Sequence, residues 1–512
     1  MADTLRHLAR GFAILRILAR HDALHMDERL PLPAALSGAA KLGLAAINLL
    51  YGKSRPDLRR GEKLAAALAE LGPAFIKLGQ VLSVRPDLVG EDLANDLGQL
   101  RDRLPPFAWS EAKAMLEAEL GSDIEHLYVG FEPEAVAAAS VAQVHFAETP
   151  DGQPLAVKLL RPGVEAAFAR DLALFAWAAD IAEKRLPGMA RLRPGDVARL
   201  VADQVAIELD LRLEAAAASE LAENFQNDPD LLVPRVDWNR TARRVLSLQR
   251  IDGIRIEDRD ALLTAGHDLP MLAQRVIHVF LRQALRDGYF HADMHHGNLF
   301  VLADGRLGLV DFGIMGRLSL KDRRFMAEML GAFLSGDWRK AARVHFDAGY
   351  VPADRDMDLF AQACRSIGEP IRDKPVAEIS IGRLLAQLFQ ITETFGMPTQ
   401  PHLLLLQKTM VTVEGVARSL DPQVNFWDAA RPEVEGWAAE NLGPEAHIRE
   451  AAEEALGMLR RIPIMLRNLE DRLAQPPTPP APAHEGQYKG RKLIPWLLGL
   501  IAALLAAGLL LD

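Results

Sequence analysis

Two aspartates and an asparagine at fixed spacing constrain the fold of this chain more than any other feature. The segment "HADMHHGNLF", residues 291–300, holds Asp293 and Asn298 five positions apart, and Asp311 follows thirteen positions later. Asp311 comes directly after the apolar run "LGLV" and shortly before a glycine, so its carboxylate can hold a metal–phosphate complex at the end of a strand. The same segment is dense in histidine, which also permits a metal-hydrolase interpretation.

The spacing favours phosphoryl transfer over a zinc site. Protein kinases carry D-x-x-x-x-N followed by DFG at this distance, where the first aspartate orients or deprotonates the nucleophile. Upstream, "LAVK" ends at Lys158 and matches the kinase strand lysine that binds the α- and β-phosphates. A surface lysine is the simpler interpretation of "AVK" alone, but three elements in kinase order outweigh it. The chain contains no H-E-x-x-H pair, so His291, His295 and His296 are expected to be scaffolding.

Two segments depart from ordinary kinases. Where those kinases have a glycine-rich loop, this chain has "VAAASVAQV", and alanine keeps the loop small but loses the access of glycine to positive φ. After the DFG motif, "GIMGRLSLKDRRFMAEML" is predicted to enter a helix almost at once, without A-P-E or a long activation segment. Because ordinary kinases dock peptides on that segment, peptide phosphorylation is not expected. The predicted nucleotide-binding loop consists of Val136, Ala137, Ala138, Ala139, Ser140, Val141, Ala142, Gln143 and Val144.

Hydrophobic periodicity predicts an α+β core with helical extensions on both sides. Residues 60–130 have apolar positions at three- and four-residue spacing, which is typical of helices. Residues 131–160 resemble a hairpin around the turn "PDG", and helices are expected again over 164–227. Short strands follow, and residues 320–470 have helical periodicity.

The composition excludes several classes of function. The 512 residues carry a net charge of −10, which argues against nucleic acid as a partner because phosphate binding requires a basic surface. The only cysteine is Cys364, so intrachain disulfides and cysteine-cage zinc sites are excluded, and a reducing compartment is indicated.

Both ends of the sequence suggest contact with a membrane. Residues 493–511 form a chargeless apolar run, long enough for about 28 Å of helix, after a proline-rich linker at 475–490. Lys489, Arg491 and Lys492 precede the run, which predicts a single span with the body of the protein on the cytoplasmic side; a buried core helix is the alternative.

The N-terminal segment is less decisive. The sequence "LRHLARGFAILRILARH" alternates apolar residues at helical spacing with arginines, as in a basic helix that lies on a membrane. An ordinary amphipathic helix and part of a transit peptide remain open as alternatives.

Taken together, the motifs resemble the UbiB family of atypical kinase-like proteins, whose members support ubiquinone (coenzyme Q) biosynthesis. The resemblance rests on "FIKLGQ" at 75–80, "ELD" at 208–210, the alanine-rich loop, "HADMHHGNL" and "DFG". It extends from Arg59 to Gly349 and, more loosely, through 414–422. It implies a two-lobed atypical protein-kinase-like fold that binds ATP and Mg²⁺.

The resemblance also implies roles for individual residues. Asp293 would be the catalytic aspartate, and Asn298 with Asp311 would bind magnesium. Lys158 would form an ion pair with Glu214, although Glu208 competes for that position.

A helical extension is implied to fold over the cleft. It would bring Lys77, one helical turn from Gln80, to face Glu208 and Asp210 of the acidic motif. A solvated helix face is the alternative interpretation of "IELDLRLEA". Three departures from the family pattern are the "MHH" at 294–296, Gln249 and Ala217.

The resemblance further implies a place and partners in the cell. The expected location is the bacterial inner membrane, with membrane lipids, prenylated phenol intermediates and other ubiquinone-biosynthesis enzymes as partners, and a homodimer is compatible with it. A nucleotide-binding pseudokinase scaffold and a small-molecule phosphotransferase remain as alternative functions. The expected domains are N-terminal helices at 1–58, the helical extension at 59–130, an N-lobe at 131–253, a C-lobe with its helical extension at 254–470, the linker at 475–490 and the span at 493–511.

Overall fold

The structure is a computed structural model, and its described residues contain the candidate site. Among the helices of the described residues, none combines the length and the apolar character needed to cross a membrane. The predicted linker at 475–490 and span at 493–511 lie outside the described residues. The described residues are 2–23, 50–51, 57–83, 89–98, 100, 105–185, 194–372, 391, 394–397 and 400–441.

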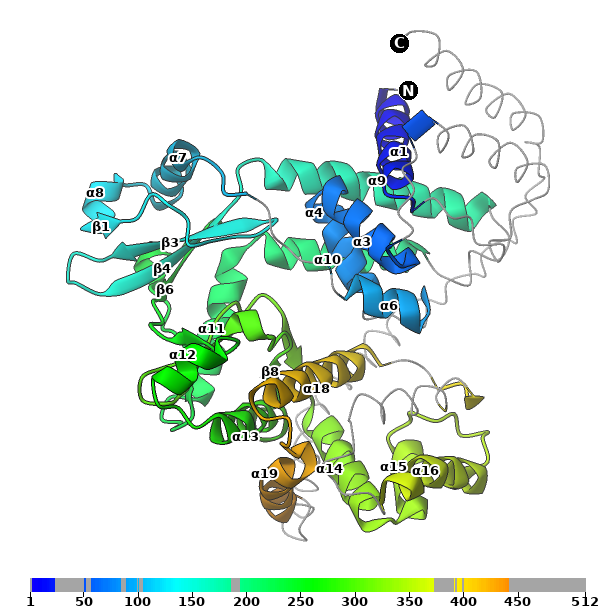
Figure 1. Cartoon of the computed structure of the whole chain (residues 1–512). Helices are drawn as coiled ribbons and strands as arrows, with labels where there is room; N and C mark the ends of the chain where they lie inside the picture. The colour runs from blue at the N-terminus through cyan, green and yellow to red at the C-terminus, as the bar shows by residue number, and fades with distance from the viewer. Residues whose placement is uncertain are drawn as a thin grey trace, which may run out of the picture. The chain divides into compact units, whose positions relative to one another are not determined.

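An antiparallel sheet forms the N-lobe (Figure 1). The strand order is β1-β3-β4-β6, and β2 pairs with β3. β3 and β4 are joined by the predicted hairpin, whose turn has Gly152 at φ +80°, a left-handed conformation that glycine adopts without strain. The strands are β1 (Gly130–Phe131), β2 (Ala137–Ala138), β3 (Ala142–Glu148), β4 (Pro154–Leu160) and β6 (Val245–Gln249).

Three helices between β4 and β6 complete the N-lobe. α11 packs against β6 and follows Asp210, whose side chain accepts a hydrogen bond from the backbone N–H of Arg212 and so caps the helix. α9 and α10 pack against each other. These helices are α9 (Val164–Arg185), α10 (Pro194–Glu208) and α11 (Leu211–Asn224).

The N-terminal extension is helical, as predicted for residues 60–130. α4 packs against α3, α6, α9 and α10, and Gly79 permits this contact because a Cβ there would meet the side chain of Leu100. α1 is held by an ion pair of 2.9 Å between Arg10 and Asp171 of α9. The helices are α1 (Ala2–Arg20), α3 (Arg60–Leu71), α4 (Pro73–Ser83), α6 (Glu91–Leu97), α7 (Trp109–Leu120) and α8 (Ile124–Leu127).

The C-lobe surrounds two small sheets. β5, β10, β9 and β7 form one sheet in that order, and β11 pairs with β8 in the other. α13 (Leu269–Leu281) continues directly into a π-helical turn, η3 (Arg282–Asp287). The other elements are β5 (Leu231–Leu232), β7 (Ile254–Arg255), α12 (Arg259–Thr264), β8 (Tyr289–His291), η4 (His296–Asn298), β9 (Leu299–Val301), β10 (Leu307–Leu309) and β11 (Met315–Arg317). The short turn η2 (Trp238–Arg240) precedes β6 and packs against that N-lobe strand.

Further helices follow β11, as the periodicity predicts. α18 packs against α13 and β11, and α19 packs against α13, η3 and α14. These helices are α14 (Leu320–Ser335), α15 (Trp338–Asp347), α16 (Met357–Arg372), α18 (Pro401–Leu420) and α19 (Phe426–Asn441).

Candidate functional site

Lys158 is at the centre of the candidate site. Its Nζ lies 2.8 and 2.9 Å from the two carboxylate oxygens of Glu214 and 2.9 Å from Oδ1 of Asp311. The three residues come from β4, from the first turn of α11 and from the segment after β10. Of the two carboxylates considered as partners of Lys158, the structure brings Glu214 into contact, whereas Glu208 contacts a different lysine.

The charges at this site are strongly coupled. Attraction by the Lys158 ammonium lowers the pKa of Asp311, although 51% of that side chain is exposed and solvent screens the effect. Burial raises the pKa of Glu214 to about 7, against the opposing attraction of Lys158. Burial lowers the pKa of Lys158, but the two carboxylates outweigh it and the net pKa is raised. The lysine is therefore charged, and two carboxylates compete for it.

His291 connects the Asp293 loop, residues 291–298, to Asp311. Its Nε2 lies 2.7 Å from the backbone carbonyl of Asp311, and its Nδ1 lies 3.1 Å from the backbone nitrogen of Asp293. This pattern requires that Nε2 donates to the carbonyl and that Nδ1 accepts from the Asp293 N–H. Burial lowers the pKa of His291, which fits a neutral ring. The scaffolding role expected for this histidine fits its place in the structure.

The side-chain amide of Asn298 is held through its nitrogen. Its Nδ2 donates to the backbone carbonyl of Asp293 over 3.0 Å, which leaves Oδ1 unused by that bond. Its backbone carbonyl accepts from Val310, the residue before Asp311, over 3.1 Å. An amide oxygen and a carboxylate fit Mg²⁺, which usually completes its coordination with phosphate oxygens and water. The donor set thus fits the predicted metal.

The other histidines of the loop contact protein groups. Nδ1 of His295 accepts from the backbone of Gly297 over 2.9 Å, and its Nε2 lies 3.7 Å from Oδ2 of Asp293. Nε2 of His296 lies 2.9 Å from Oγ of Ser419 on α18. Within the described ranges, no group of three or more histidine, cysteine, aspartate or glutamate side chains is arranged to hold a metal ion. The zinc interpretation gains no support there.

The alanine-rich loop divides into an outer and an inner part. Two hydrogen bonds support the loop. Nε of Arg161 donates to the carbonyl of Ala139 over 2.9 Å, and Oε1 of Gln143 accepts from the backbone N–H of Phe107 over 2.9 Å. The side chain of Gln143 therefore braces the loop, so only its backbone can line a nucleotide site. Val136 and Ala137 are exposed, Ala138, Ala139 and Val144 are half-buried, and Ser140, Val141, Ala142 and Gln143 are buried.

The acidic motif is only partly arranged as expected. Nζ of Lys77 on α4 lies 2.6 Å from Oε2 of Glu208 at the end of α10. Asp210 does not take part in this pair, because its carboxylate caps α11 and binds the guanidinium of Arg212 at 2.6 and 2.9 Å. Gln80 lies half-buried on the same helix as Lys77.

Several supports of the Asp293 loop were not predicted. Oε1 of Gln283 in η3 accepts from the backbone of His291 over 2.8 Å, and Oγ1 of Thr409 on α18 donates to the carbonyl of Ala292 over 3.1 Å. Both contacts join residues that are distant in the sequence or belong to an irregular turn. Neither has a local signal in the sequence.

Comparison with known families assigns most of the chain. Residues 99–345 match the ABC1 atypical kinase-like domain, and residues 364–425 match the UbiB helical domain. The first match contains the predicted metal-binding residues and all the predicted catalytic residues except Lys77, and the second contains the whole of α18.

Individual proteins are similar over almost the whole chain. A "Probable protein kinase UbiB" of Marinobacter nauticus is 40% identical over 475 residues, which is 92% of this chain and 86% of that protein. One of the same description from Pseudomonas fluorescens is 40% identical over 98% of this chain and 94% of its own length. The solved structure of Rv3197 from Mycobacterium tuberculosis with erythromycin has a TM-score of 0.51 at 22% identity, covering 79% of this chain and 100% of that one. At this identity the structural match supports the fold alone.

Proposed function

The chain belongs to the UbiB family of ABC1-type atypical kinase-like proteins, and we propose that it is an atypical kinase or ATPase that binds Mg-ATP and supports ubiquinone biosynthesis. The observation that carries the proposal is the contact of Lys158 with both Glu214 and Asp311. Kinases use such a lysine–glutamate pair to hold the phosphates and the DFG aspartate to hold the metal.

Each residue of the site has a role in this proposal. Lys158, held by Glu214, binds the α- and β-phosphates, and Asp293 orients the attacking group. Asn298 and Asp311 would hold Mg²⁺, which would neutralise charge on the transferring phosphate. Asp311 must then exchange part of its contact with Lys158 for the metal, and its half-exposed side chain is free enough to do so.

The phosphoryl acceptor proposed here is water or a small lipid rather than a protein. Only a short segment that includes β11 separates Gly313 from the start of α14 at Leu320, so little chain is available there to dock a peptide. Lys77 attaches the N-terminal extension to Glu208, three residues before the helix that carries Glu214. Both features favour a restricted site over an open platform.

The two alternative functions differ in what they require. A pseudokinase scaffold would need nucleotide binding but no complete set of Lys158, Asp293, Asn298 and Asp311, so the intact set favours turnover. A small-molecule phosphotransferase would not need the Lys77–Glu208 contact, which favours the UbiB-like role.

Location and partners also belong to the proposal. The apolar run at 493–511 would anchor the body to the cytoplasmic face of the bacterial inner membrane. There the protein would regulate the ring-modifying enzymes of ubiquinone synthesis, in contact with membrane lipids and prenylated phenols, and a homodimer is compatible with this arrangement.

The test measures phosphate release and radiolabel transfer in parallel. Purified full-length protein is incubated with Mg-ATP, with and without vesicles containing a prenylated phenol, and with a generic peptide substrate. We expect phosphate release that vesicles increase, with negligible peptide labelling, and loss of release in Asp293→Asn. Efficient labelling of peptides would replace this proposal by an ordinary protein kinase, and nucleotide binding without any turnover would favour the scaffold.

A further inference from the structure

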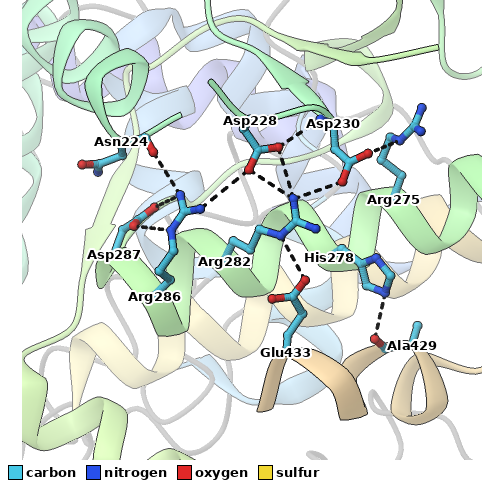
Figure 2. A network of polar contacts seen from close by, with 10 residues as sticks. All are labelled: Asn224, Asp228, Asp230, Arg275, His278, Arg282, Arg286, Asp287, Ala429 and Glu433. Atoms are coloured by element: carbon cyan, nitrogen blue, oxygen red, sulfur yellow. Dashed lines mark hydrogen bonds and ion pairs between the residues drawn. The ribbon is translucent and has the colours of Figure 1, made fainter. Parts of the chain in front are cut away.

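Arg282 lies at the centre of a charged network that joins three parts of the chain (Figure 2). Its Nη1 contacts Asp228 at 3.1 and 3.2 Å and Asp230 at 3.0 Å, in the segment between α11 and β5. Its Nε donates to Glu433 of α19 over 3.0 Å. One guanidinium thus links the segment between α11 and β5, the C-lobe turn η3 and α19.

Arg286, one turn further on, extends the network to α11. Its Nη2 donates to the carbonyl of Asn224, the last residue of α11, over 3.1 Å, and its Nε donates to Asp287 over 2.7 Å. Its Nη1 lies 3.7 Å from Asp228, the carboxylate that Arg282 also binds. The helix that carries Glu214 is therefore fixed at its far end to the same turn.

Gln283 lies between these arginines and is fully buried. Its Oε1 accepts from the backbone of His291, and its Nε2 approaches Sδ of Met294 at 3.8 Å. These two residues flank Asp293 in the sequence, so η3 contacts the charged network through its arginines and the Asp293 loop through its glutamine. π-helical turns are rare and occur frequently at functional sites.

We infer that Arg282 is a positioning residue, which, through its ion pair with Glu433 and the adjacent Gln283, couples the placement of α19 to that of the Asp293 loop. The inference rests on the proposed function in so far as the loop is catalytic. It goes further by assigning to α19 an influence on the chemistry, although α19 contributes no residue to the site described above.

A purely structural anchor would behave differently. α19 buries Phe426, Ala430 and Val434 in the main hydrophobic core, and these contacts keep it docked without the ion pair. Glu433 and Arg282 keep 25% and 20% of their side chains exposed, so solvent screens their pair. Removing Glu433 also leaves Arg282 neutralised by Asp228 and Asp230. Loss of the Glu433 carboxylate should therefore change the orientation of Arg282 rather than unfold α19.

The first test compares Glu433→Ala with Glu435→Ala, two residues further along the same helix and 70% exposed. Hydrogen exchange of residues 289–298 is measured on the full-length proteins, together with the melting temperature. We expect faster exchange of the His291 amide region in Glu433→Ala alone, at a melting temperature close to that of the wild type. Glu433→Gln keeps an acceptor oxygen and should restore part of the protection. Equal exchange in Glu433→Ala and Glu435→Ala would overturn the inference.

The second test measures ATP turnover in the same proteins. A displaced loop should lower kcat about three- to tenfold with little change in the KM for ATP, since Lys158 and the alanine-rich loop are untouched. If the wild type hydrolyses no ATP, the proposed function fails, while the exchange experiment still decides the inference. If Glu433→Ala retains full kcat in an active enzyme, the coupling does not exist.

Discussion

Asp311 combines an unusual backbone conformation with a side chain that we propose as a metal ligand. Its φ of +64° is in the left-handed region, which costs most non-glycine residues about 1–2 kcal/mol and is tolerated best by glycine, asparagine and aspartate. The carbonyl of Asp311 is held by His291 and its carboxylate by Lys158, so the surrounding contacts compensate for this conformation. Such conformations occur preferentially at functional sites. The backbone conformation of Asp311 thus supports the functional role proposed for it.

The first prediction uses this conformation to separate metal binding from folding. Asp311→Asn should keep the fold, because asparagine tolerates positive φ and has nearly the same volume, but should lose Mg-ADP binding because a ligand charge is removed. In the wild type, Mg-ADP at a hundredfold excess over Kd should stabilise the protein by about 2.7 kcal/mol. Thermal-shift titration measures both proteins, with Asp304→Asn, half-exposed in a surface turn, as control. Undiminished stabilisation of Asp311→Asn would exclude the metal role.

At the scale of elements, local sequence patterns predicted helices and strands, whereas the contacts between distant residues could not be predicted from them. The hairpin, the helical extension and the early start of α14 follow from periodicity and turn residues that act within a few positions. Asp210 was expected to face Lys77, but an aspartate at the start of a helix also satisfies free backbone N–H groups, and here it caps α11. Gln143 was expected in the nucleotide loop, yet its side chain binds the backbone of Phe107, which no local pattern indicates.

The second prediction concerns the N-terminal extension. Lys77→Ala should leave Glu208 without its lysine and loosen the contact of α4 with α10, which we expect to cost about 1–2 kcal/mol of stability and to alter nucleotide affinity. Lys63→Ala is a matched control, because Lys63 is as buried as Lys77 and its 2.6 Å pair with Asp22 lies elsewhere in the same extension. Mg-ADP affinity and phosphate release are measured for both variants. The same change in both would mean that Lys77 acts only through stability.

The third prediction concerns the stability of the protein at low pH and the buried His345 of α15. Burial lowers the pKa of His345 below its usual 6.5, and its Nδ1 donates to the carbonyl of Ala341 over 2.7 Å. Below about pH 6.5 the unfolded chain therefore binds a proton that the folded chain resists, so this contribution to stability is present above pH 6.5 and is lost as the pH falls. His345→Gln should lose less stability than the wild type between pH 7.5 and 5.5. His126→Gln, at an exposed position, should behave like the wild type in these melting curves.

At the scale of the whole molecule, one hydrophobic core connects the extension, both lobes and the C-terminal helices that are described. It includes Phe75 of α4, Leu221 of α11, Phe280 of α13 and Val416 of α18. Because these side chains are buried together, we expect the described part to unfold as a cooperative unit apart from two separate clusters, one around Leu116 and one around Phe360. A change at the proposed membrane anchor should then affect location without disturbing the site.

The last prediction tests that separation. Deleting residues 488–512 removes the apolar run and its basic flank but leaves every core residue of the described part in place. The truncated protein should leave the membrane fraction in part or fully, because a basic amphipathic segment such as 5–21 binds a membrane only reversibly, whereas a spanning helix does not dissociate. Its stabilisation by Mg-ADP should equal that of the full chain, since the proposed nucleotide site lies in the retained part. Fractionation in high salt and carbonate extraction measure the first effect, and thermal shift measures the second. A truncated protein that resists carbonate would mean that a second segment is inserted in the bilayer, whereas loss of Mg-ADP stabilisation would mean that the anchor and the site depend on each other.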